Sequence, residues 1–304
     1  MRAVLVALCV AAALASARHS AAAPAPDAPY VSTPDNVVEA MLELGRVGPA
    51  DYLVDLGCGD GRIVITAAKK LGARGMGVDL DSSLVAGARR AAEREGVAGR
   101  VSFQANDLFF TDISRATVVT MYLLQSVNLR LRPRLLKELK PGTRIVSHDF
   151  DLDRWQPDEM LTVPVPDKVY GPPSSKLFMW VVPADASGAW NWQLDVAGAT
   201  REYTVSLEQE FQILSGSMTV AGLSAAVAGR MRGEEIGWVL TLEIDGRPLR
   251  HEFSGRLSGD TIAGWVTIGG ARLEWRARRA ARGRMETGAG APGLRTILIV
   301  EGQT

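Results

Sequence analysis

The chain has 304 residues, 47% of them hydrophobic, and equal totals of 34 basic and 34 acidic residues, so its formal net charge is zero. This composition is typical of a globular protein with room for two ordinary domains, and it excludes a disordered chain. The charge balance, with no basic stripe interleaved with aromatic residues, argues against nucleic acid as a partner.

The first residues predict export or membrane anchoring. Arg2 precedes an apolar run over 3–15 that ends in Ala-Ser-Ala, which is the layout of a secretory signal peptide. The run is shorter than the roughly 20 residues of a transmembrane helix, so a cleaved signal is favoured over an uncleaved anchor or a cytosolic extension. We expect a signal peptide or short membrane anchor over 1–23, a linker over 24–29, and a periplasmic or secreted protein. The alternative is a membrane-anchored protein with a cytosolic catalytic domain.

Residues 30–186 predict an α/β domain. Thr33 is expected to cap a first helix that starts at Pro34. Strands then alternate with helices, which indicates a mostly parallel sheet covered on both faces, and the last two strands form an antiparallel hairpin. The expected strands are 52–56, 75–80, 101–105, 116–123, 144–150, 160–165 and 176–182, and the expected helices after the first are 62–71, 83–95 and 129–139.

Residues 187–304 predict a β-rich domain of unknown role. Polar and apolar residues alternate between glycine turns, without a helical period of useful length. An antiparallel β-barrel or sandwich fits this pattern, and a lipocalin-like holder of a lipid or partner is one interpretation. Four tryptophans near the junction are expected in core or interdomain packing: Trp155, Trp180, Trp190 and Trp192.

The stretch VDLGCGDGR, residues 54–62, places three glycines between a strand and a helix. Gly57, Gly59 and Gly61 allow the backbone to approach a ligand closely. Their Gly-x-Gly-x-Gly spacing differs from the Gly-x-Gly-x-x-Gly that places a helix N-terminus against a pyrophosphate. A ligand without phosphates therefore fits better. A glycine-rich turn without a ligand is the alternative, but the flanking strands and helix favour a binding loop.

Three aspartates follow the same edge of the predicted sheet. Asp55 precedes the first glycine and can orient the loop or receive an ammonium group through water. Asp79 ends the second strand, 24 residues after Asp55, where a carboxylate can accept hydrogen bonds from both hydroxyls of an adenosine ribose. Asp107 follows the third strand and can accept from the exocyclic amine of adenine, which Leu108 or Phe109 would cover.

The glycine loop with Asp79 and Asp107 resembles the class I S-adenosylmethionine-dependent methyltransferases over residues 30–183. The segments YVSTPDNVVEAML, DLGCGDGRIVITAA, VTMYLLQSVN and LKPGTRIVSHDF are similar to the protein-lysine methyltransferases that include the ATP synthase c-subunit and adenine nucleotide translocase enzymes. Ser32 and Gln125 stand where that family usually has proline. The resemblance implies a Rossmann-like domain with a seven-stranded sheet and S-adenosyl-L-methionine as cofactor. The implied partner is a protein that presents a lysine, membrane-associated proteins included.

The resemblance also implies site residues. Tyr122 and Asn128 are expected near the acceptor, and Tyr30 and Thr33 at the methionine end of the donor. A lysine amine must be neutral to attack although its ordinary pKa is about 10.4, so oxygen acceptors beside it are needed. From the residues alone, Tyr122 could equally be a core aromatic and Asn128 a helix N-cap. His148 is expected to be structural or to line the acceptor loop rather than to act as a base.

Metal chemistry is not expected, because the histidines His19, His148 and His251 have no ligand spacing with one another or with Cys58. A second hypothesis treats the chain as an exported ligand-binding or interaction protein with a methyltransferase-like fold and a lipocalin-like β-domain. Its basis is that export would separate an enzyme from a cytosolic methyl donor.

Overall fold

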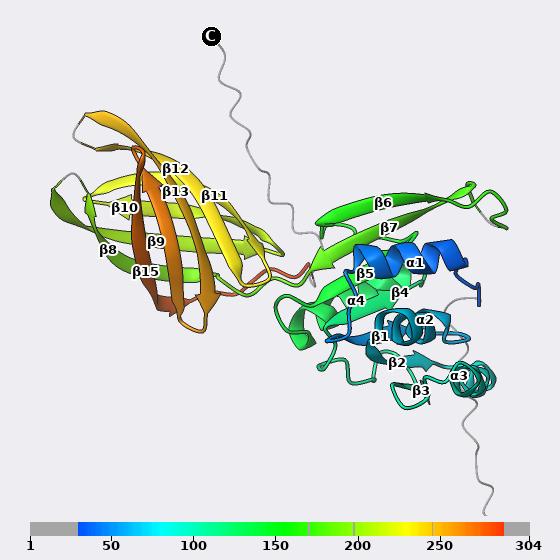
Figure 1. Cartoon of the computed structure of the whole chain (residues 1–304). Helices are drawn as coiled ribbons and strands as arrows, with labels where there is room; N and C mark the ends of the chain where they lie inside the picture. Colours follow the sequence, from blue (N-terminus) through cyan, green and yellow to red (C-terminus); the bar gives the residue numbers. More distant parts are fainter. Residues whose placement is uncertain (1–29, 170, 197, 245, 289–304) are drawn as a thin grey trace, which may run out of the picture.

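The structure is a computed structural model and describes residues 30–169, 171–196, 198–244 and 246–288. Figure 1 shows two bodies of different architecture, an α/β part and, further along the chain, a barrel. The expected fold class is confirmed for both parts, and of the two alternatives for the second part the barrel is correct. The expected leader and linker lie outside the described residues. Within the described ranges, no helix is long and apolar enough to cross a membrane.

A seven-stranded sheet with the order β3-β2-β1-β4-β5-β7-β6 forms the centre of the α/β part. Neighbouring strands from β3 to β5 are parallel. Strand β7 runs antiparallel to β5 and to β6, which confirms the expected closing hairpin. The strands are β1 (Tyr52–Leu56), β2 (Arg74–Asp79), β3 (Val101–Ala105), β4 (Val118–Met121), β5 (Arg144–His148), β6 (Glu159–Pro164) and β7 (Ser174–Val181).

Helices cover both faces of this sheet, because successive side chains of a strand point to opposite faces. On β1, Leu53 packs in the apolar cluster formed with three helices, whereas Val54 and Leu56 pack in the cluster formed with the fourth. The first three helices are α1 (Asp35–Leu44), α2 (Arg62–Leu71) and α3 (Ser82–Arg94), and the fourth is α4 (Gln125–Glu138).

Two expectations about helix starts are wrong. Helix α1 follows Pro34 without a side-chain cap, and the Thr33 hydroxyl instead lies 3.5 Å from Nδ1 of His148. Helix α4 begins at Gln125, four residues before the expected start, so Asn128 lies inside it and is no N-cap. Buried apolar residues of α4 begin at Val127, so packing against the sheet extends the helix through polar residues that suggested a loop.

The second part is a closed barrel of eight antiparallel strands in the order β10-β11-β12-β13-β14-β15-β8-β9. Pairing of β15 with β8 closes it, which removes the free edges that an open sheet would expose. The strands are β8 (Gly188–Val196), β9 (Ala199–Glu210), β10 (Ile213–Val220), β11 (Leu223–Arg232), β12 (Glu235–Ile244), β13 (Arg247–Ser258), β14 (Thr261–Ile268) and β15 (Ala271–Arg282).

Aromatic side chains fill the barrel. The rings of Trp192, Trp238, Phe253 and Trp275 lie with their centroids 5.1–6.4 Å apart, which is the range of favourable aromatic pairs. An eight-stranded barrel is just wide enough for side chains to fill, as they do in this one. The expected packing role of the four junction tryptophans is confirmed: Trp155 and Trp180 are buried in the α/β part, and Trp190 and Trp192 in the barrel.

Candidate active site

The glycine loop between β1 and α2 has a backbone that only glycine adopts easily. Gly57 and Gly59 have φ angles of 79° and 52°, in the left-handed region where a Cβ atom is strained. A Cβ on Gly57 would lie 2.7 Å from Cδ2 of Leu123, and one on Gly59 would lie 2.3 Å from Cε2 of Tyr30. The loop therefore has room for a ligand and an overlying tyrosine only because side chains are absent from it.

Gly61 has a different role from the other two glycines. Its φ of 78° is also left-handed, but a Cβ there would meet Phe103 at 2.6 Å and Ala88 at 2.9 Å. These contacts are packing between α2, β3 and α3, and Gly61 does not line the pocket described below. The backbone at Gly61 therefore lies close to other residues of the protein, whereas the spacing predicts a close approach to a ligand.

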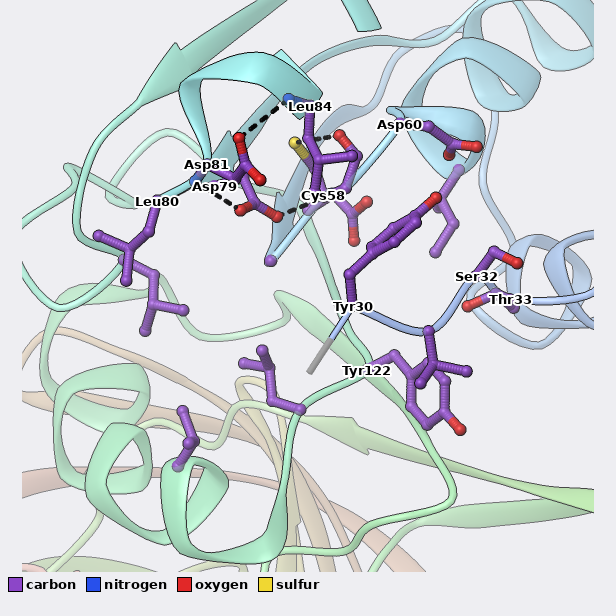
Figure 2. Close-up of a pocket in the computed structure, with 18 of the residues that line it drawn as sticks. Tyr30, Ser32, Thr33, Cys58, Asp60, Asp79, Leu80, Asp81, Leu84 and Tyr122 are labelled. Atoms are coloured by element: carbon purple, nitrogen blue, oxygen red, sulfur yellow. Dashed lines mark hydrogen bonds between the residues drawn. The ribbon is translucent and has the colours of Figure 1, made fainter. Parts of the chain in front are cut away.

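Asp79, at the end of β2, has both carboxylate oxygens held by backbone amides. Oδ2 accepts from the Gly59 amide at 2.9 Å, and Oδ1 accepts from the Asp81 amide at 3.0 Å. Figure 2 shows Asp79 between the glycine loop and the start of α3, with Asp81 beside it. Each carboxylate oxygen can accept a second bond, so Asp79 has acceptor capacity for the two hydroxyls of a ribose.

Asp55 is a buried carboxyl at the end of β1. Its side chain accepts from the Thr120 hydroxyl at 2.7 Å, and the residue is only 2% exposed. Burial raises the pKa of Asp55 to about 7, against the opposing hydrogen bond from Thr120. Because Asp55 also lines the pocket, a cationic ligand there would relieve the cost of ionising it.

A third aspartate and an N-terminal clasp complete the donor side. Oδ1 of Asp107 accepts from the Phe109 amide at 2.8 Å, which fixes the turn after β3. Arg62 forms an ion pair with Asp60 at 2.6 Å and donates to the backbone oxygen of Thr33 at 2.8 Å. Arg62 therefore ties the segment before α1 to the glycine loop. This role was not predicted, because in the sequence Arg62 is only the first residue of a helix.

These residues surround one pocket of about 480 Å³ at the carboxyl ends of the parallel strands. The pocket collects seven of the eight predicted cofactor residues and one of the two predicted catalytic residues. Figure 2 shows the Tyr30 ring between the aspartates and Tyr122. Those lining the pocket are Tyr30, Thr33, Asp55, Gly57, Gly59, Asp79, Asp107 and Tyr122, whereas Gly61 and Asn128 are not in its lining.

At another part of the pocket lining, Tyr122 stacks on His148 with ring centroids 3.8 Å apart. His148 is 1% exposed and its Nε2 lies 2.8 Å from the Ser175 hydroxyl. Burial lowers the pKa of His148 to about 4, so the imidazole is neutral near pH 7. Burial also raises the pKa of Tyr122, and the charge of Asp149 adds to this effect. Both rings are therefore uncharged, and Tyr122 is a phenol with free acceptor capacity.

Asp149 is a site residue that was not predicted. It follows β5 with a left-handed φ of 62°, and its Oδ2 lies 2.5 Å from Nζ of Lys168 and 3.4 Å from Nε2 of His148. The Lys176 amide donates to its Oδ1 at 3.0 Å. The sequence predicts a strand over 144–150 that includes Asp149, whereas β5 ends at His148. Both lysines that contact Asp149 come from the distant β6–β7 hairpin region.

Asn128 is fully buried in α4, and its side chain binds the backbone of the segment that follows β5. Its Nδ2 donates to the backbone oxygen of Phe150 at 3.1 Å and to the Ser147 hydroxyl at 3.3 Å. Both partners lie at the end of β5 and in the following β5–β6 loop, which we define as residues 149–158. A role for Asn128 in catalysis stays a prediction, and the contacts favour loop holding over direct contact with an amine.

Known proteins resemble the α/β part of the chain. Residues 55–159 match the family model of the ANTKMT methyltransferase domain. A protein-lysine N-methyltransferase of Saccharolobus islandicus is 50% identical over 139 residues, which cover 45% of this chain and 86% of that protein. The adenine nucleotide translocase lysine N-methyltransferase of Mus musculus is 41% identical over 130 residues, which cover 42% of this chain and 56% of that protein.

One solved structure shares comparable identity. It is described as an RNA methyltransferase from Salinibacter ruber in complex with S-adenosyl-L-homocysteine, and it is 50% identical. The match covers 51% of this chain and 95% of that chain, with a TM-score of 0.47. The Homo sapiens lysine N-methyltransferase of the ATP synthase c-subunit is 35% identical and is covered over 56% of its length, so this chain spans only about half of some curated relatives.

Fold and pocket together define a class I S-adenosylmethionine-dependent methyltransferase, and S-adenosylmethionine is its cofactor. More narrowly, the chain belongs to the protein-lysine N-methyltransferase family represented by the Saccharolobus islandicus protein, because half of the aligned residues are identical over most of that protein. The hypothesis of a ligand-binding module without turnover is not favoured by these matches. The family match ends at residue 159, before the barrel begins.

Proposed function

We propose that this protein transfers a methyl group from S-adenosylmethionine to a lysine side chain of a protein substrate. The observation that carries the proposal is the pocket itself, in which three aspartates and Tyr122 meet at one edge of the sheet. The uncharged His148 ring stacks on Tyr122 from outside the pocket lining. The 50% identity to a protein-lysine N-methyltransferase supports lysine as the acceptor.

On the donor side, each aspartate suits a different part of the cofactor. Asp79, whose carboxylate is held by two backbone amides, would accept from the ribose hydroxyls. Asp55 would pair with the cationic amino group, which would relieve the cost of ionising this buried carboxyl. Asp107 and Phe109 lie where an adenine would meet a carboxylate and a ring. Together the three carboxylates would fix the donor's position in the pocket.

The cofactor supplies an electrophilic methyl group that is taken by in-line attack, so the protein chiefly positions the two reactants. An attacking lysine must first lose a proton, since its ordinary pKa is about 10.4. The uncharged rings of Tyr122 and His148 add no positive charge, and the Tyr122 oxygen can accept a hydrogen bond from the neutral amine. Because burial raises its pKa, Tyr122 stays a phenol and orients the amine without acting as a strong base.

Transfer of tritium from labelled S-adenosylmethionine to a cell extract tests the proposal. The purified protein is incubated with extract, and samples are then treated separately with protease and with ribonuclease. We expect label that protease releases and ribonuclease leaves in place, and an Asp79→Ala control that transfers none. Label released by ribonuclease instead would contradict a protein acceptor and would favour an RNA acceptor.

We also propose that residues 1–23 direct the chain to or across a membrane. The support is Arg2 and the apolar run with its small-residue end. Because S-adenosylmethionine is made in the cytosol, a membrane-anchored chain with a cytosolic catalytic domain is the arrangement that suits the enzyme. Cell fractionation with an antibody to the barrel separates this arrangement from a periplasmic or secreted protein.

A further inference from the structure

The turn between β9 and β10 places an aromatic side chain of the barrel in the core of the α/β part. Phe211 lies in the turn between β9 and β10 and has a left-handed φ of 52°, which is unusual for a bulky residue. It is 2% exposed, and it belongs to the apolar cluster of the α/β part. The turn therefore inserts its phenyl ring into the catalytic domain.

Phe211 contacts the β5–β6 loop from the barrel side. Its ring stacks on Trp155 with centroids 5.8 Å apart and planes within 4°. Beside it, the Gln212 side chain, which is 1% exposed, donates to the backbone oxygen of Gln156 at 2.6 Å. An ion pair between Arg230 on β11 and Asp158 adds a third contact from barrel to loop.

Helix α4 also contacts the β5–β6 loop. Side chains one and two turns apart bind successive parts of it: Gln125 donates to the Asp151 carboxylate at 2.8 Å, Asn128 to the Phe150 oxygen at 3.1 Å, and Arg132 to the Leu152 oxygen at 2.9 Å. The Arg132 guanidinium also lies over the Phe211 ring, 5.4 Å from its centroid. The β5–β6 loop is therefore bound both by α4 and by the barrel turn.

The β5–β6 loop contains two residues with left-handed backbone, and its first residues lie next to the site. Asp149 and Asp153 both have left-handed φ angles, 62° and 55°, and such residues persist only where surrounding contacts determine the conformation. Phe150, the second residue of the loop, lies beside Tyr122 of the pocket, with ring centroids 6.4 Å apart. Loosening the loop would displace Phe150 from Tyr122, whereas Asp149 is held separately by Lys168 and the Lys176 amide. The donor aspartates on β1 and β2 would stay in place.

We infer that the barrel supports the acceptor side of the pocket: through Phe211, its β9–β10 turn holds the β5–β6 loop in the conformation that places Phe150 beside Tyr122. Phe211 is a positioning residue, since it acts through Trp155 and the loop and is not in the lining of the pocket. If the barrel were only a tether or a docking module, removing the Phe211 side chain would leave the conformation of the loop unchanged.

Hydrogen–deuterium exchange of the full chain, read by mass spectrometry, tests this inference. Phe211→Ala is expected to speed exchange in residues 149–158 at least fivefold, and Phe211→Leu, which keeps apolar volume without a ring, less than that. The matched control is Phe253→Ala, the same truncation at a site 3% exposed inside the barrel, which should leave loop exchange within twofold of wild type. Unchanged loop exchange in Phe211→Ala, or an equal rise in Phe253→Ala, would overturn the inference.

Two further readouts separate positioning from general damage. Titration with S-adenosylhomocysteine should give a Kd within threefold of wild type for Phe211→Ala, whereas kcat for tritium transfer to extract protein falls at least tenfold and Phe211→Leu restores part of it. A donor affinity that falls as much as kcat would overturn the inference. If Phe211→Ala does not fold, the leucine variant decides by the same criteria. The kinetic readout rests on the proposed function, and a wild-type protein that transfers no label refutes that function while the exchange comparison still decides this inference.

Discussion

The two parts of the molecule use glycine, aromatic and acidic residues for different ends. In the α/β part, glycines clear space for a ligand and aspartates at strand ends face a pocket. In the barrel, buried and exposed residues alternate along the strands, and four large aromatic rings meet at the centre. The comparison shows that the polar groups of the pocket lie at strand ends, where carboxylates that bind backbone amides can still accept further hydrogen bonds. The inward positions of the barrel strands are instead used for packing. The β9–β10 turn links the barrel to the packing of the α/β part through Phe211.

The largest expected effect is on stability and comes from the barrel. Phe253→Ala removes a 3% exposed ring from the aromatic cluster, and truncations of this kind cost about 3–5 kcal/mol. Chemical denaturation followed by circular dichroism should show that loss in the barrel's transition. Affinity for S-adenosylhomocysteine, measured on the folded variant, should stay at the wild-type value. A loss of this affinity would show that donor binding depends on the packing of the barrel core.

The converse change is Asp79→Ala, which should abolish donor binding and leave the fold intact. Two charge-assisted hydrogen bonds to a ribose are lost, each worth roughly 1.5–3 kcal/mol, so affinity should fall about 100-fold or more. Isothermal titration with S-adenosylmethionine measures this, with far-UV circular dichroism as the check on folding. Glu274→Ala, which removes an exposed carboxylate from β15, is the matched control, and retained affinity in Asp79→Ala would show that the ribose contact is misplaced.

Gly59→Ala should weaken donor binding by about tenfold or more. The new Cβ would overlap the Tyr30 ring, 2.3 Å from Cε2, at a left-handed φ of 52°, so the ring must leave its place over the loop. Gly222→Ala in the β10–β11 turn is the control, because its φ of 82° carries the same kind of backbone strain with no atom within 4 Å. Both variants should lose about 1–2 kcal/mol of stability from the left-handed backbone, but only Gly59→Ala should lose affinity in the titration.

Asp55 should make donor binding depend on pH, an effect of about the same size as that of Gly59→Ala. Because burial raises its pKa to about 7, the free protein holds a proton there below pH 7, and a donor ammonium must displace it. Affinity should therefore fall as the pH drops from about 7 to about 5.5, by up to roughly tenfold per unit. Titrations in Asp55→Asn should be weaker and flat over that range, and a flat profile in the wild type would refute the assignment.

Much of the α/β part could be predicted because its determinants are local. The loop, Asp79 and Asp107 follow buried strands at positions where parallel strand ends meet, so periodicity and glycine spacing place them. Gly61 shows the limit of that reasoning, since its spacing matches the other glycines while its neighbours are Phe103 and Ala88. Only tertiary packing separates the two roles.

What could not be predicted depends on contacts between distant segments. Asn128 was a candidate cap because it starts an apparent helix pattern, yet packing at Val127 extends the helix before it. Asp149 owes its place to lysines from the β6–β7 hairpin region. Phe211 lies in an ordinary strand-to-strand turn of the sequence, and its left-handed backbone and its insertion against Trp155 follow from how the two parts meet.

The central claim, that the acceptor is a lysine of a protein, is tested most directly by amino-acid analysis of the labelled product. Protein labelled from tritiated S-adenosylmethionine by the purified enzyme is hydrolysed in acid, and the radioactive fractions are compared with methylated amino-acid standards. The account predicts that the label elutes with methylated lysines and is absent when Asp79→Ala replaces the wild type. Label that elutes with methylated arginine or histidine, or that remains with RNA, would contradict it.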